Sequence, residues 1–224
     1  MGELLYNGGM MAKYPIFLEL GGRRAVVIGA GSVAARKSES LLAAGARLVV
    51  VAEHVENMPS AITRSPNVEV VKAKYSKDYL VGATIAIAAT DNHELNKQIF
   101  RDCQELEILC NVVDEPELCD FYVPAVVKRG DLQVAVGTEG NCPAYAGHIR
   151  KKLEEIITNK HGQFLAELER FRKRVVADVT SAANRKALLG QLVDDESFEC
   201  FVKDGPAAWR ERVEGIIQKY RGRQ

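Results

Sequence analysis

The 224-residue sequence lacks the marks of several protein classes. Its formal net charge is zero, with 30 basic and 30 acidic side chains, whereas general nucleic-acid-binding proteins usually carry a basic excess. No apolar run approaches the ~20 residues that a membrane-spanning helix needs. Residues 1–10 have no basic segment followed by an apolar one, as a signal peptide would. We therefore expect a cytoplasmic protein that binds neither nucleic acid nor membranes.

The sequence also has little that would build a disulfide framework or a zinc site. The five cysteines are odd in number, widely spaced and without a C-x-x-C pair: Cys103, Cys110, Cys119, Cys142 and Cys200. The histidines show no H-x-x-x-H spacing: His54, His93, His148 and His161. This pattern fits a reducing compartment, and we assign no metal ligand.

What the sequence does have, in its first half, is an alternation of apolar runs and helical patterns. Strand-like runs occupy residues 24–28, 47–51, 68–71, 84–89 and 108–113. Helical patterns occupy residues 32–44 and 92–107. Such alternation predicts βαβ units, and continuously apolar strands predict a parallel sheet covered by helices on both faces.

The second half changes character. Residues 122–127 and 132–137 are strand-like and joined by a short connection, which favours an antiparallel hairpin. Pro143 suits the first turn of a helix. Helical patterns then follow at residues 143–159, 161–178, 181–193, 195–203 and 206–220. We predict an α/β protein in four parts: a disordered leader (1–12), a Rossmann-like domain (13–118), a hairpin and helix region (119–150) and a helical domain (151–224).

The most informative local motif is G-A-G-S-V-A, directly after the first strand and at the start of the first helix. In a G-x-G-x-x-A turn the first glycine permits the tight turn, the second lets a pyrophosphate approach the backbone, and the alanine lets the helix pack on the sheet. The N–H groups at the helix start then face the phosphate charge. The alternative is a sheet-to-helix turn without a ligand. The motif assigns cofactor contacts to Gly29, Gly31, Ser32, Val33 and Ala34.

Two further groups extend the predicted dinucleotide site. Glu53 ends the second strand, 22 residues after Gly31, where an acid can bind the ribose hydroxyls of NAD and disfavour NADP. Thr90 and Asn96 follow the fourth strand and are candidates for the nicotinamide ribose. The alternatives are that Glu53 is a solvated loop residue and that Asp91 or Asn92 only caps the next helix.

Beyond this turn, a series of short motifs occurs in a characteristic order. They are P-I-F at 15–17, G-A-G-S-V-A-A-R-K at 29–37, A-A-T-D at 88–91 with Asn96, C-N-V-V-D at 110–114, F-Y-V-P-A at 121–125, V-A-V-G-T at 134–138, C-P at 142–143 and I-R at 149–150. This order resembles the precorrin-2 dehydrogenase family, which includes the N-terminal half of bacterial siroheme synthase. Cys142 departs from the pattern, since relatives commonly have serine there.

The resemblance implies a Rossmann domain, a small dimerisation region and a helical domain. It also implies NAD as the oxidant and precorrin-2 as the substrate, with Fe(II) or Co(II) insertion into sirohydrochlorin in some relatives. The aspartate of C-N-V-V-D, which is tied to activity in the family, corresponds to Asp114. Placed after a buried strand, this carboxylate could take a proton as general base. The alternative is a turn aspartate, because Asp114-Glu-Pro is also a turn signal.

The carboxylates of precorrin-2 call for basic partners, and arginine can bind a carboxylate with two-pronged geometry. The candidates for substrate contact are Lys128, Arg129, Arg150 and Lys151, together with Asn111 and Thr138 from the family motifs. A solvated basic face is the alternative for each basic residue.

We further expect a homodimer, as the resemblance implies. The helical tail carries more apolar positions than we expect a small tail to bury alone: Leu165, Leu168, Phe171, Val175, Leu188, Leu192 and Phe201. Two other functions remain open. One is an NAD-sensing regulatory module, although such modules lack the C-N-V-V-D and F-Y-V-P-A pair. The other is a metal chelatase that uses the Rossmann fold only as a scaffold.

Overall fold

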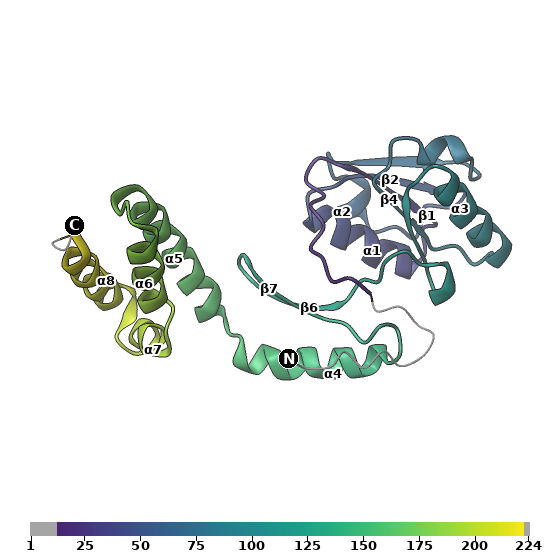
Figure 1. Ribbon diagram of the computed structural model, residues 1–224. Coiled ribbons are helices and arrows are strands. Elements are labelled where there is room, and N and C mark those ends of the chain that lie inside the picture. The colour runs from purple at the N-terminus through teal and green to yellow at the C-terminus, as the bar shows by residue number, and fades with distance from the viewer. Residues whose placement is uncertain (1–12, 222–224) are drawn as a thin grey trace. The chain divides into compact units, whose positions relative to one another are not determined.

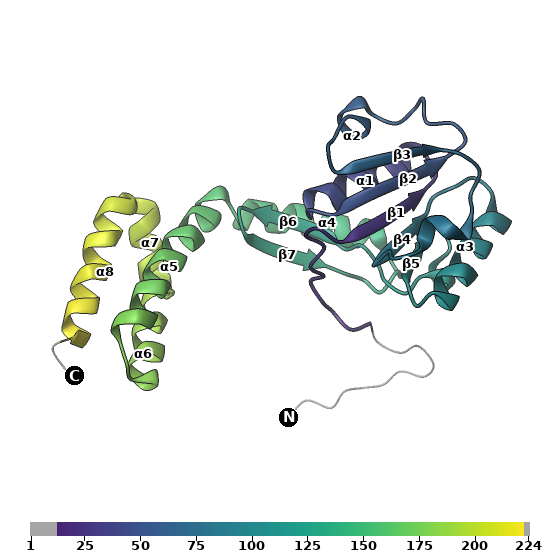
Figure 2. The ribbon, with the colours of Figure 1, turned by 90° about the horizontal axis from the view of Figure 1, so that it is seen from above.

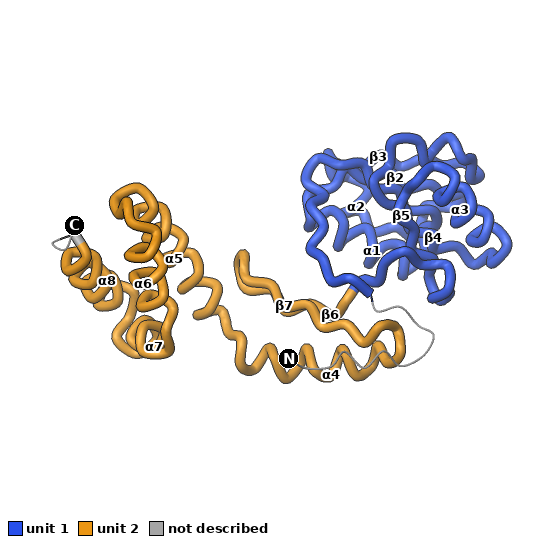
Figure 3. Tube along the Cα trace, viewed as in Figure 1, with its two compact units in different colours: residues 1–123 blue, residues 124–224 orange. Residues whose placement is uncertain are grey.

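The computed structural model describes residues 13–221, so the leader predicted over residues 1–12 lies outside the described residues. The chain divides into two compact units between Val123 and Pro124 (Figure 3). The hairpin and all of the later helices belong to the second unit. The first unit positions the predicted dinucleotide site.

A five-stranded parallel sheet forms the centre of the first unit (Figure 1), as the sequence pattern predicts. Its strand order is β3-β2-β1-β4-β5. The strands are β1 (Arg24–Ile28), β2 (Arg47–Ala52), β3 (Val68–Lys72), β4 (Ile85–Ala88) and β5 (Leu109–Val112). The order reverses direction at β1, which has β2 on one side and β4 on the other. Ligands of open α/β sheets bind at the carboxyl ends of the strands beside such a reversal.

Alternate residues of the strands serve two separate cores, one on each face of the sheet. On β1, Ala25 and Val27 pack into one core with the buried face of α1 (Ser32–Ala43). Val26 and Ile28 pack into the other, against α3 (His93–Glu105). This period of two explains why the central strands β1, β2 and β4 are apolar along most of their length. The shorter helices are α2 (Ser60–Thr63), η1 (Lys77–Leu80) and η2 (Pro116–Leu118), none of which the sequence pattern predicts.

The second unit begins with the predicted antiparallel hairpin, formed by β6 (Ala125–Arg129) and β7 (Leu132–Val136) (Figure 2). The prediction placed its first strand at residues 122–127, about three residues too early. The strand starts only after Pro124, which has no N–H to donate. Arg129 pairs with Leu132, so the turn has two residues, and its first, Gly130, has φ of 60°. Two-residue hairpin turns need that left-handed conformation.

Among the described residues five helices follow the hairpin, and the last four of them build a core of their own. The five are α4 (Pro143–Ile156), α5 (Asn159–Asp178), α6 (Ala182–Leu192), α7 (Asp195–Lys203) and α8 (Gly205–Arg221). Trp209 is fully buried, and its Nε1 donates to Ser197 Oγ at 2.7 Å. The rings of Phe164 and Phe171 approach it edge-on, each with its centroid 5.3 Å away.

This core corrects one expectation. Of the tail positions that we expected to remain exposed to a partner, five are buried within the unit: Phe171, Val175, Leu188, Leu192 and Phe201. Leu168 also packs against them. Four helices that cross each other bury more apolar surface than the sequence pattern suggested, so these side chains give no argument for a dimer. None of the described helices is long and apolar enough to cross a membrane. The five cysteines are free thiols.

Candidate active site

The glycine turn joins β1 to α1, and its first glycine is required by the protein itself. Gly29 has φ of 114°, and its N–H donates to the Val51 carbonyl oxygen at 2.9 Å. A Cβ at this position would lie 2.1 Å from the carbonyl oxygen of Ala89. The turn therefore runs directly over the end of β4, and only glycine fits there.

The second glycine, Gly31, is not required by the backbone conformation or by a neighbouring protein atom. Gly31 has φ of −75°, which any residue adopts, and a Cβ on it would meet no protein atom within 4 Å. Gly31 is the N-cap of α1, and no side chain among residues 13–221 caps the helix there. Ala34, one turn into the helix, is fully buried against the sheet. The open space over Gly31 and the uncapped N–H groups beside Ser32 and Val33 fit a bound pyrophosphate.

Glu53 stands at the same edge of the sheet as this turn. It follows Ala52, the last residue of β2, and β2 pairs with β1 so that Val51 lies opposite Ile28. Its side chain is exposed. A carboxylate next to the glycine turn and open to ligands fits the ribose-binding role, which stays a prediction.

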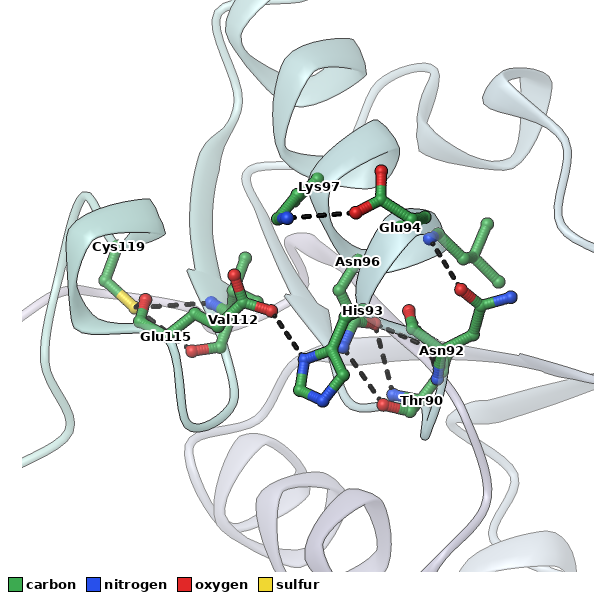
Figure 4. Close-up of polar contacts among 10 residues, drawn as sticks. Thr90, Asn92, His93, Glu94, Asn96, Lys97, Val112, Glu115 and Cys119 are labelled. Carbon is green, nitrogen blue, oxygen red and sulfur yellow. Dashed lines mark hydrogen bonds and ion pairs between the residues drawn. The ribbon is translucent and has the colours of Figure 1, made fainter.

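Thr90 and Asn96 are brought together at the end of β4 (Figure 4). The Thr90 hydroxyl donates to Asn96 Oδ1 at 2.7 Å, and Asn96 Nδ2 donates to the Thr90 carbonyl oxygen at 3.0 Å. Asn96 is 2% exposed, so its amide holds Thr90 rather than reaching a ligand itself. Asn92 is the helix cap, because its Oδ1 accepts from the Leu95 N–H at 3.1 Å. Capping and ligand contact thus fall to different residues in this loop.

Asp114 follows β5 at the same edge, since β4 and β5 pair in parallel. Its φ is 62°, a left-handed conformation that is uncommon outside glycine and is enriched at functional sites. The side chain is exposed, and it makes no hydrogen bond or ion pair to any of residues 13–221. The carboxylate is therefore available to a ligand.

Asn111, predicted to contact substrate, lies inside β5 and is 6% exposed. Its Nδ2 donates to the Phe121 carbonyl oxygen at 2.9 Å and to Cys119 Sγ at 3.3 Å. Both amide hydrogens are thus used to hold the returning chain against the strand. Burial raises the pKa of the Cys119 thiol, which keeps its proton and donates to the Val112 carbonyl oxygen at 3.2 Å. The substrate contact of Asn111 stays a prediction, with only its Oδ1 left for it.

Lys37, on the second turn of α1, is half-buried, and burial together with Arg36 lowers its pKa.

One residue pair was missed by the sequence pattern altogether. His93 Nδ1 lies 3.0 Å from Glu115 Oε1 and joins the loop after β4 to the loop after β5. The two residues are 22 positions apart, so no local spacing marks them. The available signal was that each follows one of two adjacent strands.

The other predicted substrate contacts belong to the second unit. Arg129 Nε donates to the Ile157 carbonyl oxygen at 2.9 Å, which ties the hairpin to the end of α4. Arg150 pairs with Glu154 one turn along α4. Thr138 Oγ1 accepts from the Cys142 N–H at 3.3 Å, which supports Cys142 as the entry to α4. Lys128 is exposed and makes no ion pair with the described residues. Of the described residues, no three His, Cys, Asp or Glu side chains group as a metal site would.

Comparison with known proteins agrees with this geometry. Residues 16–125 match the family model described as putative NAD(P)-binding, and residues 129–156 match the central model of sirohaem biosynthesis proteins. The siroheme synthase of Pseudomonas putida strain W619 is 43% identical over 165 residues, 74% of this chain and 36% of that protein. The chain belongs to the siroheme synthase family. The siroheme synthase of Psychrobacter arcticus is 35% identical over 176 residues, 79% of this chain and 32% of that protein.

The chain thus spans about a third of the length of these curated relatives. A solved structure titled "SirC, precorrin-2 dehydrogenase" has the same fold, with a TM-score of 0.76. The match covers 92% of this chain and all of that one, at 23% sequence identity. The first unit is accordingly an NAD(P)-binding domain of the siroheme synthase family.

Proposed function

We propose that this protein oxidises precorrin-2 to sirohydrochlorin with NAD as the hydride acceptor, a step of siroheme biosynthesis. The observation that carries the proposal is the shared edge of the sheet, where the glycine turn and the unpaired Asp114 carboxylate both stand. A family whose curated members are siroheme synthases supports the choice of substrate.

The chain contributes binding and orientation at one end of this edge. The N–H groups at the start of α1 bind the pyrophosphate, and the absent side chain of Gly31 leaves room for it. Glu53 accepts hydrogen bonds from the adenosine ribose, and Thr90, held by Asn96, lies toward the nicotinamide half. When bound, NAD supplies a ring carbon that accepts a hydride from the substrate.

At the other end of the edge, Asp114 handles the proton. Oxidation of precorrin-2 removes one hydride and one proton, so a base must take the proton as the hydride leaves. The Asp114 carboxylate accepts it, and the resulting carboxylic acid returns the proton to solvent after product release. Its left-handed φ of 62° supports the proposal, because such conformations cluster at functional sites.

The substrate-binding and subunit assignments are part of the same proposal. Lys128, Arg129 and Arg150 bind substrate carboxylates, and Thr138 and Asn111 offer neutral polar contacts. The protein forms a homodimer through the hairpin and α4. Among residues 13–221 this two-stranded sheet has no further strand on either edge, and unpaired strand edges are sites where a second chain can add. Light scattering at micromolar concentration tests the dimer, and a monomer there would contradict it.

The decisive experiment is an anaerobic assay with precorrin-2, with and without NAD. We expect sirohydrochlorin and NADH to appear together, and only when NAD is present. NAD binding without turnover would favour the alternative of a sensing module. Fe(II) or Co(II) is then added to the product, because metal insertion is the second activity that the family resemblance implies. Metal insertion without any NAD requirement would favour the chelatase.

A further inference from the structure

A pair formed by His93 and Glu115 bridges the two loops at the carboxyl ends of β4 and β5. His93 Nδ1 and Glu115 Oε1 are 3.0 Å apart, within hydrogen-bonding distance for either protonation state of the ring (Figure 4). Glu115 is the residue directly after Asp114. A bond to Glu115 therefore acts one residue away from the carboxylate to which the proposed function gives the proton transfer.

The β4 side of this bridge is fixed. His93 is the first residue of α3, and the preceding Asn92 caps that helix. Thr90 and Asn96 add two short hydrogen bonds, at 2.7 and 3.0 Å, that hold the start of the loop to the helix. The imidazole thus extends from a backbone that is anchored at both ends.

The β5 side is held by hydrogen bonds on both sides of Asp114. The Val113 N–H donates to the Ala88 carbonyl oxygen at 2.9 Å, before Asp114. After it, Cys119 Sγ lies 3.3 Å from the Glu115 carbonyl oxygen and accepts from the Val112 N–H at 3.3 Å. Between these anchors Asp114 has its left-handed φ of 62°. Such a conformation persists only where its surroundings determine it.

Packing holds only the far end of this loop, where Leu118 and Cys119 contact the core of the first unit. An open pocket of about 630 Å³ lies between α3 and residues 115–118, with Phe100 and Arg101 on the helix side. Residues 115–117 border this pocket, so the hydrogen bonds of Glu115 contribute to their position. The Glu115 side chain is 20% exposed and the His93 side chain 75% exposed, so the carboxylate is mostly covered while the ring is open to solvent. The nearby charges on α3, Glu94 and Lys97, pair with each other.

We propose that His93 and Glu115 are positioning residues that hold the Asp114 carboxylate in its productive place. The inference rests on the proposed function for its kinetic part. It adds a residue pair to which neither the sequence motifs nor the comparisons give a role. The hydrogen bond between His93 and Glu115 constrains the backbone after Asp114, and the hydrogen bond of Val113 constrains the backbone before it. Without the bond between His93 and Glu115, residues 114–117 lose their side-chain connection to the start of α3.

The test compares His93→Ala and Glu115→Ala with the conservative Glu115→Gln, which keeps an oxygen and adds an N–H toward the ring. We expect kcat to fall about ten- to hundredfold in both alanine variants, because a misplaced catalytic group costs that much. KM for NAD should stay within about twofold, and Glu115→Gln should recover most of the rate. The double alanine variant should lose no more than either single one, as expected of residues that act as a unit.

Glu94→Ala is the matched control. It removes an exposed carboxylate next to His93 that pairs with Lys97 rather than with the Asp114 loop, so kcat should stay within about twofold. Hydrogen–deuterium exchange of the cofactor-free protein gives a readout independent of activity. Peptides covering residues 113–118 should exchange faster in His93→Ala and at the normal rate in Glu94→Ala.

Either of two results overturns the inference: normal kcat in both alanine variants, or unchanged exchange of residues 113–118. A rate loss that is fully explained by a lowered melting temperature would also overturn it, since the pair would then only stabilise the fold. If the unaltered protein fails to oxidise precorrin-2, the proposed function is wrong, and the exchange experiment still decides whether the pair holds the loop.

Discussion

The two halves of the carboxyl edge are built in different ways. At the ends of β1 and β2 the site is made by the backbone, through a glycine that passes over Ala89 and a helix start without a side-chain cap. At the ends of β4 and β5 it is made by side chains that bind one another across the loops. Where the backbone forms the site, an added side chain takes up space that the turn or the ligand needs. Where side chains form the site, each one depends on the residue to which it is hydrogen-bonded. Substitutions should therefore act differently at the two ends.

The largest effect should come from Gly29→Ala. The new Cβ would lie 2.1 Å from the Ala89 carbonyl oxygen, on a backbone with φ of 114°. Either the turn or the end of β4 must move, and we expect a loss of about 3 kcal/mol or more in the free energy of unfolding. Chemical denaturation measures it. A variant as stable as the unaltered protein would show that the turn is not as tight as described.

Gly31→Val separates ligand binding from folding at the same turn. The added atoms meet no protein atom near Cβ, so the melting temperature should change little. They fill the space that the pyrophosphate needs, and NAD binding should become undetectable by calorimetry. Gly137→Val is a control, since that glycine also has open space around it but lies in the second unit. Normal NAD binding by Gly31→Val would place the dinucleotide elsewhere.

Asp114→Ala tests the other end of the edge. Its carboxylate contacts no other described side chain, so NAD binding should be retained. The free energy of unfolding should fall by only about 1 kcal/mol, because alanine tolerates the left-handed φ of 62° less well than aspartate. Turnover should fall by about 10²–10⁴, the usual contribution of a positioned general base. Asp114→Asn is the sharper variant, because it keeps the size and the tolerance for left-handed φ while losing basicity. Near-normal kcat for Asp114→Asn would mean that Asp114 only orients the substrate.

The difference between the two ends also explains what the sequence could predict. The glycine turn was predicted because each of its requirements falls within six consecutive residues. The central strands were predicted because both of their faces are buried, which makes their apolar runs continuous. The pair of His93 and Glu115 was missed because only the pairing of β4 with β5 brings them together.

Long-range contacts account for the other differences as well. Gly162 lies inside α5, in the helical pattern predicted over residues 161–178, and a Cβ there would come 2.3 Å from the Arg129 carbonyl oxygen. Its small size serves the contact with the hairpin, which no local pattern reveals. The tail's apolar positions suggested a partner surface, whereas most of them close around Trp209. Periodicity identifies an apolar face but does not say what covers it.

The smallest expected effect concerns the choice between NAD and NADP. Glu53 stands exposed beside the glycine turn, and the next residues, His54 and Val55, offer no arginine for a 2′-phosphate. The unaltered protein should therefore bind NAD more tightly than NADP. Glu53→Gln removes the charge that repels the phosphate and keeps a hydrogen-bonding amide, so NADP should gain about tenfold in affinity, or about 1.4 kcal/mol.

Glu56→Gln is the matched control for that change. Glu56 is another exposed carboxylate three residues further on, where it forms an ion pair with Lys72. Glu56→Gln changes the net charge of the protein by the same amount as Glu53→Gln. Charges in water are screened over about 10 Å at 0.1 M salt. Calorimetric titration of both variants with NAD and NADP should show a shift in Glu53→Gln alone. Equal shifts in the two variants would mean that the general field, and not a contact to the ribose, sets the preference. Tighter binding of NADP by the unaltered protein would remove Glu53 from the ribose site and leave the glycine turn as the only cofactor contact at that end of the edge.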